Sequence, residues 1–82
     1  MRIEYTKRAK KELDSLNESM KSRIKASIEK LPLGDVKKIT GNYKNRYRLR
    51  VGDYRIAFDY IKDSETVVIV IIAPRGQVYK GV

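Results

Sequence analysis

The chain has 82 residues, a net charge of +9, and neither cysteine nor histidine. It predicts one small domain, residues 1–82, without disulfides, cysteine metal sites, a thiol nucleophile or an imidazole base. Residues 67–73 form the longest apolar run, which is too short to span a bilayer, and no signal-peptide pattern opens the chain. We therefore expect a cytoplasmic protein that binds no membrane, metal or cofactor.

The first part of the chain predicts a strand and two helices. Residues 1–5 alternate between charged and apolar side chains, as a short strand does. Apolar residues then recur at helical spacing, with Thr6 as N-cap, and predict a helix to about Leu16. Asn17 is expected to break the helix or to act as a cap. A second amphipathic helix follows it and ends before Pro32. The residues expected in the core from these helices are Ala9, Leu13, Leu16, Met20, Ile24 and Ile28.

The second part predicts strands separated by turns. Short strands are expected at residues 36–40, 47–51 and 54–61, each bounded by glycine-containing or polar turns. Residues 67–72 are apolar on both faces and predict an interior strand, whereas residues 73–80 are expected to form an irregular exit segment. The predicted fold class is α+β in two layers. A strand and a helical hairpin precede a mainly antiparallel four-strand meander, and the helices pack on its apolar face.

The most informative stretch is residues 46–55, which alternates basic and apolar residues, turns, and alternates again. Gly52-Asp53 is typical of a two-residue hairpin loop, and such a loop places Arg50 opposite Arg55. Four arginines then share one side of the sheet, called the arginine face below: Arg46, Arg48, Arg50 and Arg55. The helices are expected to leave this face open. Like charges opposite one another in a hairpin are destabilising, so this face indicates a polyanion ligand.

Two residues of the next strand complete the arginine face. Ala57, opposite Arg48, is small and predicts a hollow within the cluster. Asp59 falls opposite Arg46, and we expect it to pair with that arginine and orient it. A catalytic acid or base at Asp59 is the second interpretation.

The distribution of charge indicates nucleic acid as the ligand. From Lys37 to Arg55 the sequence is rich in basic residues and contains a single acid, Asp53. Tyrosines are interleaved with the arginines. This pattern favours nucleic acid over a surface that only improves solubility. The residues assigned to RNA binding are Lys37, Lys38, Lys44 and Arg50.

These segments resemble a known family. Residues 47–56, the apolar strand 67–72 and residues 75–80 closely resemble the RelE/ParE superfamily of bacterial and archaeal toxins, and the similarity extends over the whole chain. The terminal Val78-Tyr79-Lys80 favours the RelE branch. The resemblance implies a microbial-RNase-like domain that is the toxin of a type II toxin–antitoxin pair. Such a toxin cuts mRNA in the ribosomal A site, stops translation, and is blocked by a RelB-like antitoxin in a hetero-oligomer.

The resemblance also implies the site and the reaction. The catalytic residues would be Arg46, Arg48, Arg55, Arg75 and Tyr79. A 2′-hydroxyl of the mRNA would attack the neighbouring phosphate without a metal ion and leave a 2′,3′-cyclic phosphate. Because arginine stays protonated, it is a poor general base, and Lys44 lies close enough in sequence to substitute. Two other interpretations remain open: a ParE-like gyrase poison that cuts no RNA, and a non-catalytic RNA-binding module.

Overall fold

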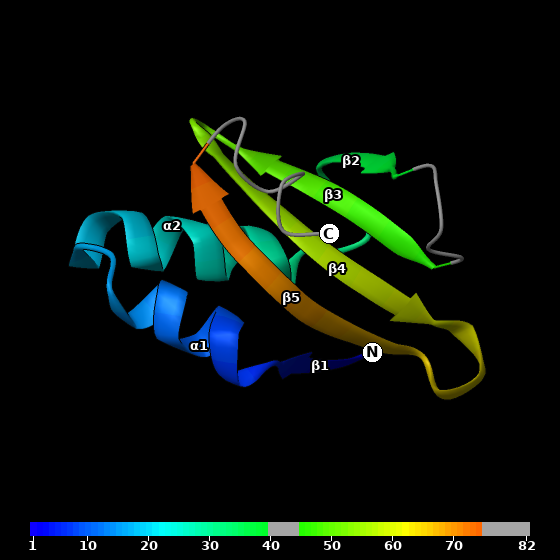
Figure 1. Cartoon of the computed structure of the whole chain (residues 1–82). Helices are drawn as coiled ribbons and strands as arrows, with labels where there is room; N and C mark the ends of the chain where they lie inside the picture. The colour runs from blue at the N-terminus through cyan, green and yellow to red at the C-terminus, as the bar shows by residue number, and fades with distance from the viewer. Residues whose placement is uncertain (40–44, 75–82) are drawn as a thin grey trace.

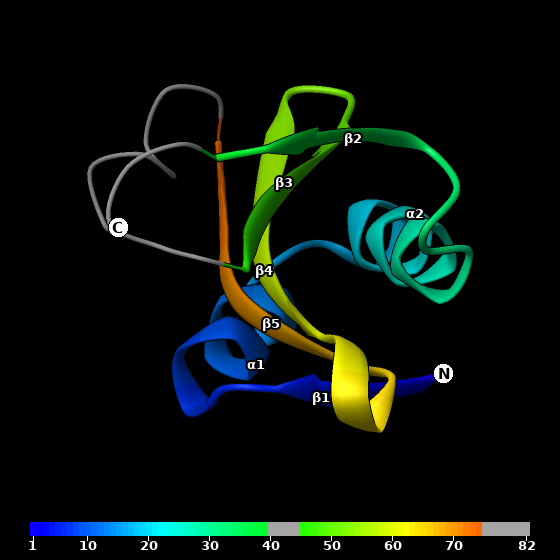
Figure 2. The ribbon, with the colours of Figure 1, turned by 90° about the vertical axis from the view of Figure 1, so that its right-hand side faces the viewer.

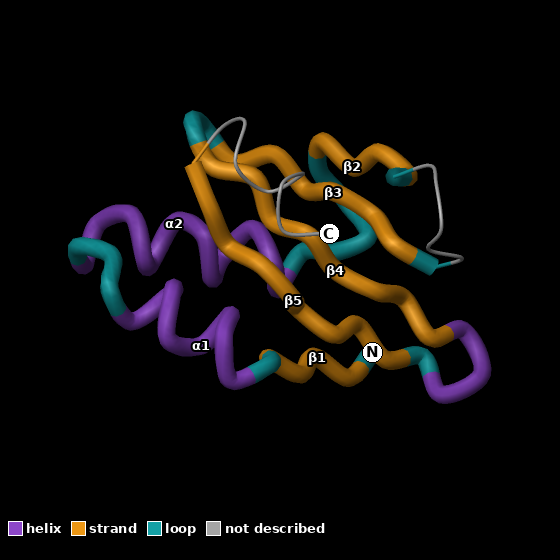
Figure 3. The backbone as a smooth tube through the Cα atoms, in the orientation of Figure 1, coloured by secondary structure: helices purple, strands orange, loops and turns teal. Residues whose placement is uncertain are grey.

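A computed structural model of the chain (Figures 1 and 3) describes residues 1–39 and 45–74. Within these residues the elements follow the predicted order of a strand, two helices and four further strands. The strands are β1 (Arg2–Tyr5), β2 (Asp35–Lys38), β3 (Arg46–Val51), β4 (Tyr54–Ile61) and β5 (Thr66–Pro74). The helices are α1 (Lys7–Asp14) and α2 (Glu18–Glu29), with a 3-10 turn, η1 (Lys62–Ser64), between β4 and β5.

The strands form one mixed sheet in the order β1-β5-β4-β3-β2. Strands β2 to β5 are the predicted antiparallel meander, and β1 pairs in parallel with β5, so that Arg2 lies opposite Thr66 and Tyr5 opposite Ile69. The first strand and the last described strand therefore lie side by side (Figure 1). The prediction of an interior strand at residues 67–72 is confirmed, because β5 has a neighbour on both sides.

Side-chain caps fix where both helices begin. The Thr6 hydroxyl accepts a hydrogen bond from the backbone N–H of Ala9, and the Asn17 side chain accepts one from the N–H of Met20. Both predicted caps are therefore confirmed. Helix α1 ends at Asp14, before the expected end at Leu16, because Asn17 already begins α2. Leu16 still packs against the core from the turn between the helices.

The core lies between the two helices and one face of the sheet, as predicted. In Figure 2 α2 lies to one side of β3 and β4. The buried residues of the core are Ala9, Leu13, Ile24, Ile28, Leu31, Leu49, Val51, Ile56, Phe58, Val67, Ile69 and Ile72. Tyr47 and Tyr54 are half-buried at its margin, and the Tyr47 ring stacks on Phe58 with centroids 5.6 Å apart. On the opposite side of the sheet Ala57, Ile71 and Ala73 form a smaller buried cluster.

Helix α1 covers the part of β5 that extends beyond β1. Strand β1 pairs with β5 only as far as Ile69. Beyond that point the Thr6 hydroxyl donates to the carbonyl of Val70 (3.2 Å), and the Glu12 carboxylate accepts from the N–H of Ile72 (3.0 Å). These side chains satisfy backbone groups that would otherwise be left without a strand neighbour.

Glu12→Ala is expected to lower the free energy of unfolding by about 1.5–2 kcal/mol, because the buried N–H of Ile72 loses an ionised acceptor. Urea unfolding measures the change. Glu12→Gln retains an acceptor oxygen and should cost less. Arg8→Ala is the control, since the Arg8–Glu12 ion pair (3.4 Å) is largely exposed and contributes little. Equal losses for Glu12→Ala and Arg8→Ala would show that the Ile72 bond is unimportant.

Two predicted boundaries were wrong. The exit segment was expected to begin at Ala73, but β5 continues through Ala73 and Pro74. Pro74 lies beyond the end of β1, where β5 has a strand neighbour on one side only, and proline is tolerated on such an edge. The strand expected at residues 36–40 runs from Asp35 to Lys38. Thr40, the last residue of that expected strand, lies outside the described residues, as does the exit segment after Pro74.

Candidate functional site

The β3–β4 hairpin builds the candidate site, and its register is the predicted one. Gly52 has φ +58°, and the pairs are Arg50 with Arg55, Arg48 with Ala57 and Arg46 with Asp59. Because side chains alternate between the two faces of a sheet, the four residues of the arginine face lie on the side away from the helices.

Gly52→Ala is expected to destabilise the hairpin by about 1 kcal/mol, because a residue with a Cβ is strained at positive φ. The new Cβ would also lie 3.2 Å from a guanidinium nitrogen of Arg23 on α2. Thermal or urea unfolding tests this, with Asp53→Ala as control because Asp53 is exposed and does not have positive φ. If Asp53→Ala lowered the free energy of unfolding more than Gly52→Ala, the turn would depend on the Asp53 side chain more than on the positive φ of Gly52.

The arginine face is less open than the sequence predicts. Arg46, Arg48 and Arg55 expose only 9%, 8% and 8% of their surface, whereas Arg50 is exposed. The expected hollow at Ala57 is also wrong, since Ala57 is fully buried against Ile71 and Ala73. Alternation fixes the side of the sheet on which a residue lies but not how deeply it is covered. The face is therefore a nearly buried row of guanidinium groups with Arg50 at its exposed end.

Asp59 holds Arg46 in a fixed orientation, as predicted. The Arg46 Nε donates to one carboxylate oxygen of Asp59, and Nη2 donates to the other at 3.1 Å. Two parallel hydrogen bonds of this kind fix the plane of the guanidinium group. Arg46 therefore contributes its charge to the site from a set position.

Arg55 is tied to the hairpin turn. Its Nη1 donates to the backbone carbonyls of Gly52 and Tyr54, both at 3.1 Å. These bonds stabilise the turn and hold the guanidinium of Arg55 near the backbone, while Arg50 opposite it extends to solvent. Arg55→Ala would thus alter the turn as well as the charge of the site.

Arg48 has unmet hydrogen-bonding capacity. Its Nε is buried and has no hydrogen-bond partner among the described residues. Its Nη2 lies 3.9 Å from a carboxylate oxygen of Asp35, which is mostly exposed. A buried donor without an acceptor costs about 1–3 kcal/mol, so Arg48 is the residue of this face that gains most from an anionic ligand.

The lysines are divided between the two faces. Lys37 is exposed and pairs with Arg48, so it extends the arginine face. Lys38 pairs with Tyr47 and lies on the opposite face, so it does not extend the arginine face, and its role in RNA binding stays a prediction. Lys44, Arg75 and Tyr79 lie outside the described residues, and their roles stay predictions.

Sequence reasoning missed Asp35. The strand was expected to begin at residue 36, but Asp35 is the first residue of β2, lies opposite Arg50 and approaches Arg48. The alternation of Asp35 with Lys37 was the available signal, because it places both on one face.

Among the described residues, no helix has the length and apolarity needed to cross a bilayer.

Comparison with known proteins shows the family to which the chain belongs. A family model described as the ParE toxin of the type II toxin–antitoxin system parDE matches residues 3–79. The toxin RelE3 of Methanocaldococcus jannaschii is 31% identical over an alignment of length 87 that covers 96% of this chain and 96% of RelE3. The chain belongs to the RelE/ParE toxin superfamily.

Solved structures of RelE toxins have the same fold. The RelE–RelB complex of Pyrococcus horikoshii OT3 is similar with a TM-score of 0.74 and 28% identity, covering 93% of this chain and 96% of the other. The RelB–RelE complex of Methanococcus jannaschii is similar with a TM-score of 0.74 and 31% identity, covering 95% and 96%. Both of these RelE-family relatives were crystallised with a RelB antitoxin.

Proposed function

We propose that this RelE-family toxin is a ribosome-dependent endoribonuclease that cuts mRNA in the ribosomal A site and thereby inhibits translation in the cytoplasm. The observation that carries the proposal is Arg48, a nearly buried arginine in the middle of the arginine face, whose Nε has no hydrogen-bond partner within residues 1–39 and 45–74. A phosphate oxygen is the acceptor that a guanidinium group binds best. The exposed cations Lys37 and Arg50 flank it and would guide the RNA backbone.

The mechanism rests on positioning and charge. A 2′-hydroxyl of the mRNA attacks the adjacent phosphorus, the 5′-oxygen departs, and a 2′,3′-cyclic phosphate forms, without a metal ion being required. Arg48 would donate to the pentacovalent phosphorane as negative charge accumulates on its oxygens. Arg46 and Arg55, held by Asp59 and by the turn, would add positive charge at fixed positions. Arg75 and Tyr79 complete the proposed catalytic set.

The proposed site lacks an efficient general base among its arginines, and this explains the need for the ribosome. Alignment of the attacking and leaving oxygens can supply about 7–11 kcal/mol of the barrier in favourable cases. Free RNA samples that alignment rarely, whereas an mRNA held in the A site is already constrained. We therefore expect slow cleavage of naked RNA.

The test is to add the purified toxin to a translating extract and to map the 5′ ends of the mRNA. Cuts in register with the A-site codon, absent when ribosomes are omitted, support the proposal. Binding to ribosomes without new 5′ ends would identify a non-catalytic RNA-binding module.

A second candidate is a ParE-like gyrase poison, which the family model named for the ParE toxin favours. A supercoiling assay with purified gyrase separates the two. Arrest of supercoiling together with intact mRNA in the extract would establish the second candidate.

We also propose a RelB-like antitoxin as the physiological partner, in a toxin–antitoxin hetero-oligomer. The net charge of +9 favours an acidic partner, and the two archaeal relatives were crystallised with RelB. Co-expression with the neighbouring gene product should give a complex that survives high salt. Free toxin that is tolerated by growing cells would contradict this partnership.

A further inference from the structure

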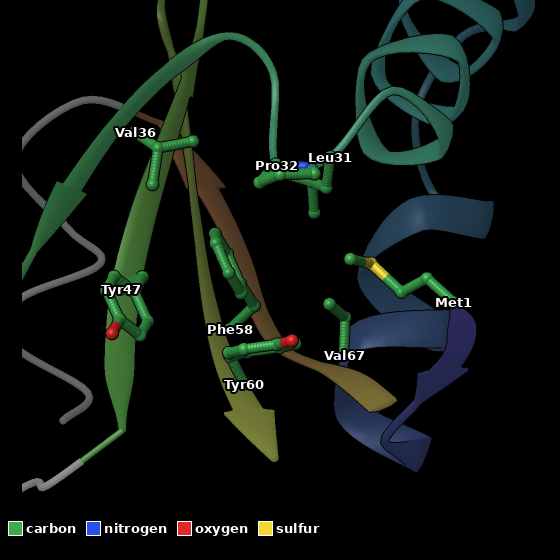
Figure 4. Close-up of a pocket in the computed structure, with 8 residues that line it drawn as sticks. All are labelled: Met1, Leu31, Pro32, Val36, Tyr47, Phe58, Tyr60 and Val67. Carbon is green, nitrogen blue, oxygen red and sulfur yellow. The ribbon is translucent and has the colours of Figure 1, made fainter. Parts of the chain in front are cut away.

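An apolar pocket of about 240 Å³ lies on the helix side of the sheet, away from the arginine face. Figure 4 shows side chains from β2, β3, β4 and β5 around a common space. Two residues that follow α2 and the first residue of the chain also line this space. The lining residues are Met1, Leu31, Pro32, Val36, Tyr47, Phe58, Tyr60 and Val67.

The pocket exists because the helices cover only part of the sheet. Helix α2 ends at Glu29, and Leu31 and Pro32 follow it at the pocket's border. The rings of Tyr47 and Tyr60 remain only half-buried beside it. Its volume is below the roughly 300–1,000 Å³ of a typical small-molecule site, so it is better suited to a few apolar side chains of a protein.

Two exposed lysines lie next to residues that line the pocket. Lys38 lies on the same face of β2 as Val36 and pairs with Tyr47, and Lys30 directly precedes Leu31. Both lysines are exposed. The acid at this end of α2, Glu29, lies toward β1, where burial and then the Glu29 charge raise the pKa of Tyr5. A protein segment that fills the pocket would therefore be favoured by acidic residues beside its apolar ones.

We propose that this pocket anchors an apolar segment of the antitoxin, flanked by acidic residues that face Lys30 and Lys38. The proposal rests on the antitoxin partnership stated above and specifies where the antitoxin is held. Because the pocket and the arginine face are on opposite sides of the sheet, a segment anchored here does not itself occupy the RNA site. Anchoring and inhibition are thus separate functions of the partner, and inhibition needs a further contact that reaches the arginine face.

A matched pair of variants tests the anchor in the co-purified toxin–antitoxin complex. Val36→Glu places a carboxylate in the pocket wall, whereas Leu33→Glu makes the same change of type and charge at a 71% exposed residue outside the pocket. Val36→Glu should raise the dissociation constant about thirtyfold or more, as loss of a central interface residue does. Leu33→Glu should change it by less than about threefold. Equal losses would overturn the proposal, and urea unfolding of each free toxin checks that both fold.

A second measurement needs no variant. In methyl-labelled wild-type toxin, the methyl signals of Met1, Leu31 and Val67 should shift when the antitoxin binds. Unchanged signals at these residues in a formed complex would overturn the anchor but leave the toxin function standing. Shifts that depend on toxin concentration alone would assign the pocket to a second copy of the chain and also overturn it. Absence of both a complex and mRNA cleavage would instead refute the proposed function.

Discussion

Arg48→Ala is expected to reduce ribosome-dependent mRNA cleavage by about 10²–10³-fold, the effect of removing one preorganised donor from a developing negative charge. The nearly buried Arg48 has a buried Nε without a partner among the described residues, so the described part of the protein does not use this donor. Its removal also takes away a positive charge that faces Lys37 across β2 and β3. The free energy of unfolding should therefore change by no more than about 1 kcal/mol.

Two further variants separate charge from hydrogen-bond geometry. Arg48→Lys retains the charge but loses the planar fork, and it should recover only part of the activity. Arg50→Ala removes another arginine, at the exposed end of the arginine face, and should lower the cleavage rate about tenfold or less. Single-turnover cleavage on programmed ribosomes gives the rates. Full activity of Arg48→Ala would exclude Arg48 from the catalytic set and remove the main support for the proposed nuclease.

Asp59→Ala is expected to lower the free energy of unfolding by about 2–3 kcal/mol, because the change removes both hydrogen bonds that the carboxylate accepts from a nearly buried guanidinium group. The orientation of Arg46 is lost with them, so cleavage should fall as well. Urea unfolding measures the first effect, and the programmed-ribosome assay measures the second.

Asp35→Ala is the matched control for Asp59→Ala. Asp35 also faces an arginine of β3, but its carboxylate is mostly exposed and lies 3.9 Å from Arg48. An exposed pair at this distance contributes little, and the variant should remain within about 0.5 kcal/mol of the wild type. If the two variants are equally stable, Asp59 does not stabilise the fold through Arg46.

The local pattern of the sequence is enough to predict the hairpin and its pairing. A two-residue loop at Gly52-Asp53 leaves one register, and that register alone places Asp59 opposite Arg46, where the structure has it. The caps at Thr6 and Asn17 are equally predictable, because short polar side chains at these positions satisfy N–H groups of the first helical turn.

Features that depend on distant contacts could not be predicted in the same way. The strand at residues 1–5 was expected, but nothing local indicates that β1 pairs with β5. The faces of Lys37 and Lys38 depend on the register of a short strand, in which a shift by one residue exchanges them. The depth of Arg48 and the pocket beside Tyr60 arise where several elements meet, and no single segment of sequence encodes them.

The parallel pairing of β1 with β5 has a consequence for synthesis of the protein. Strand β5 is translated after every other described element, yet it is the neighbour of both β1 and β4 and supplies Val67, Ile69 and Ile72 to the core. Until these residues leave the ribosome, β1 has no strand to pair with and the helices lack much of the surface that they cover. The sheet and the core of the described domain therefore cannot be completed before residues 66–74 are synthesised. The activity proposed above would therefore be absent until β5 has left the ribosome that makes it.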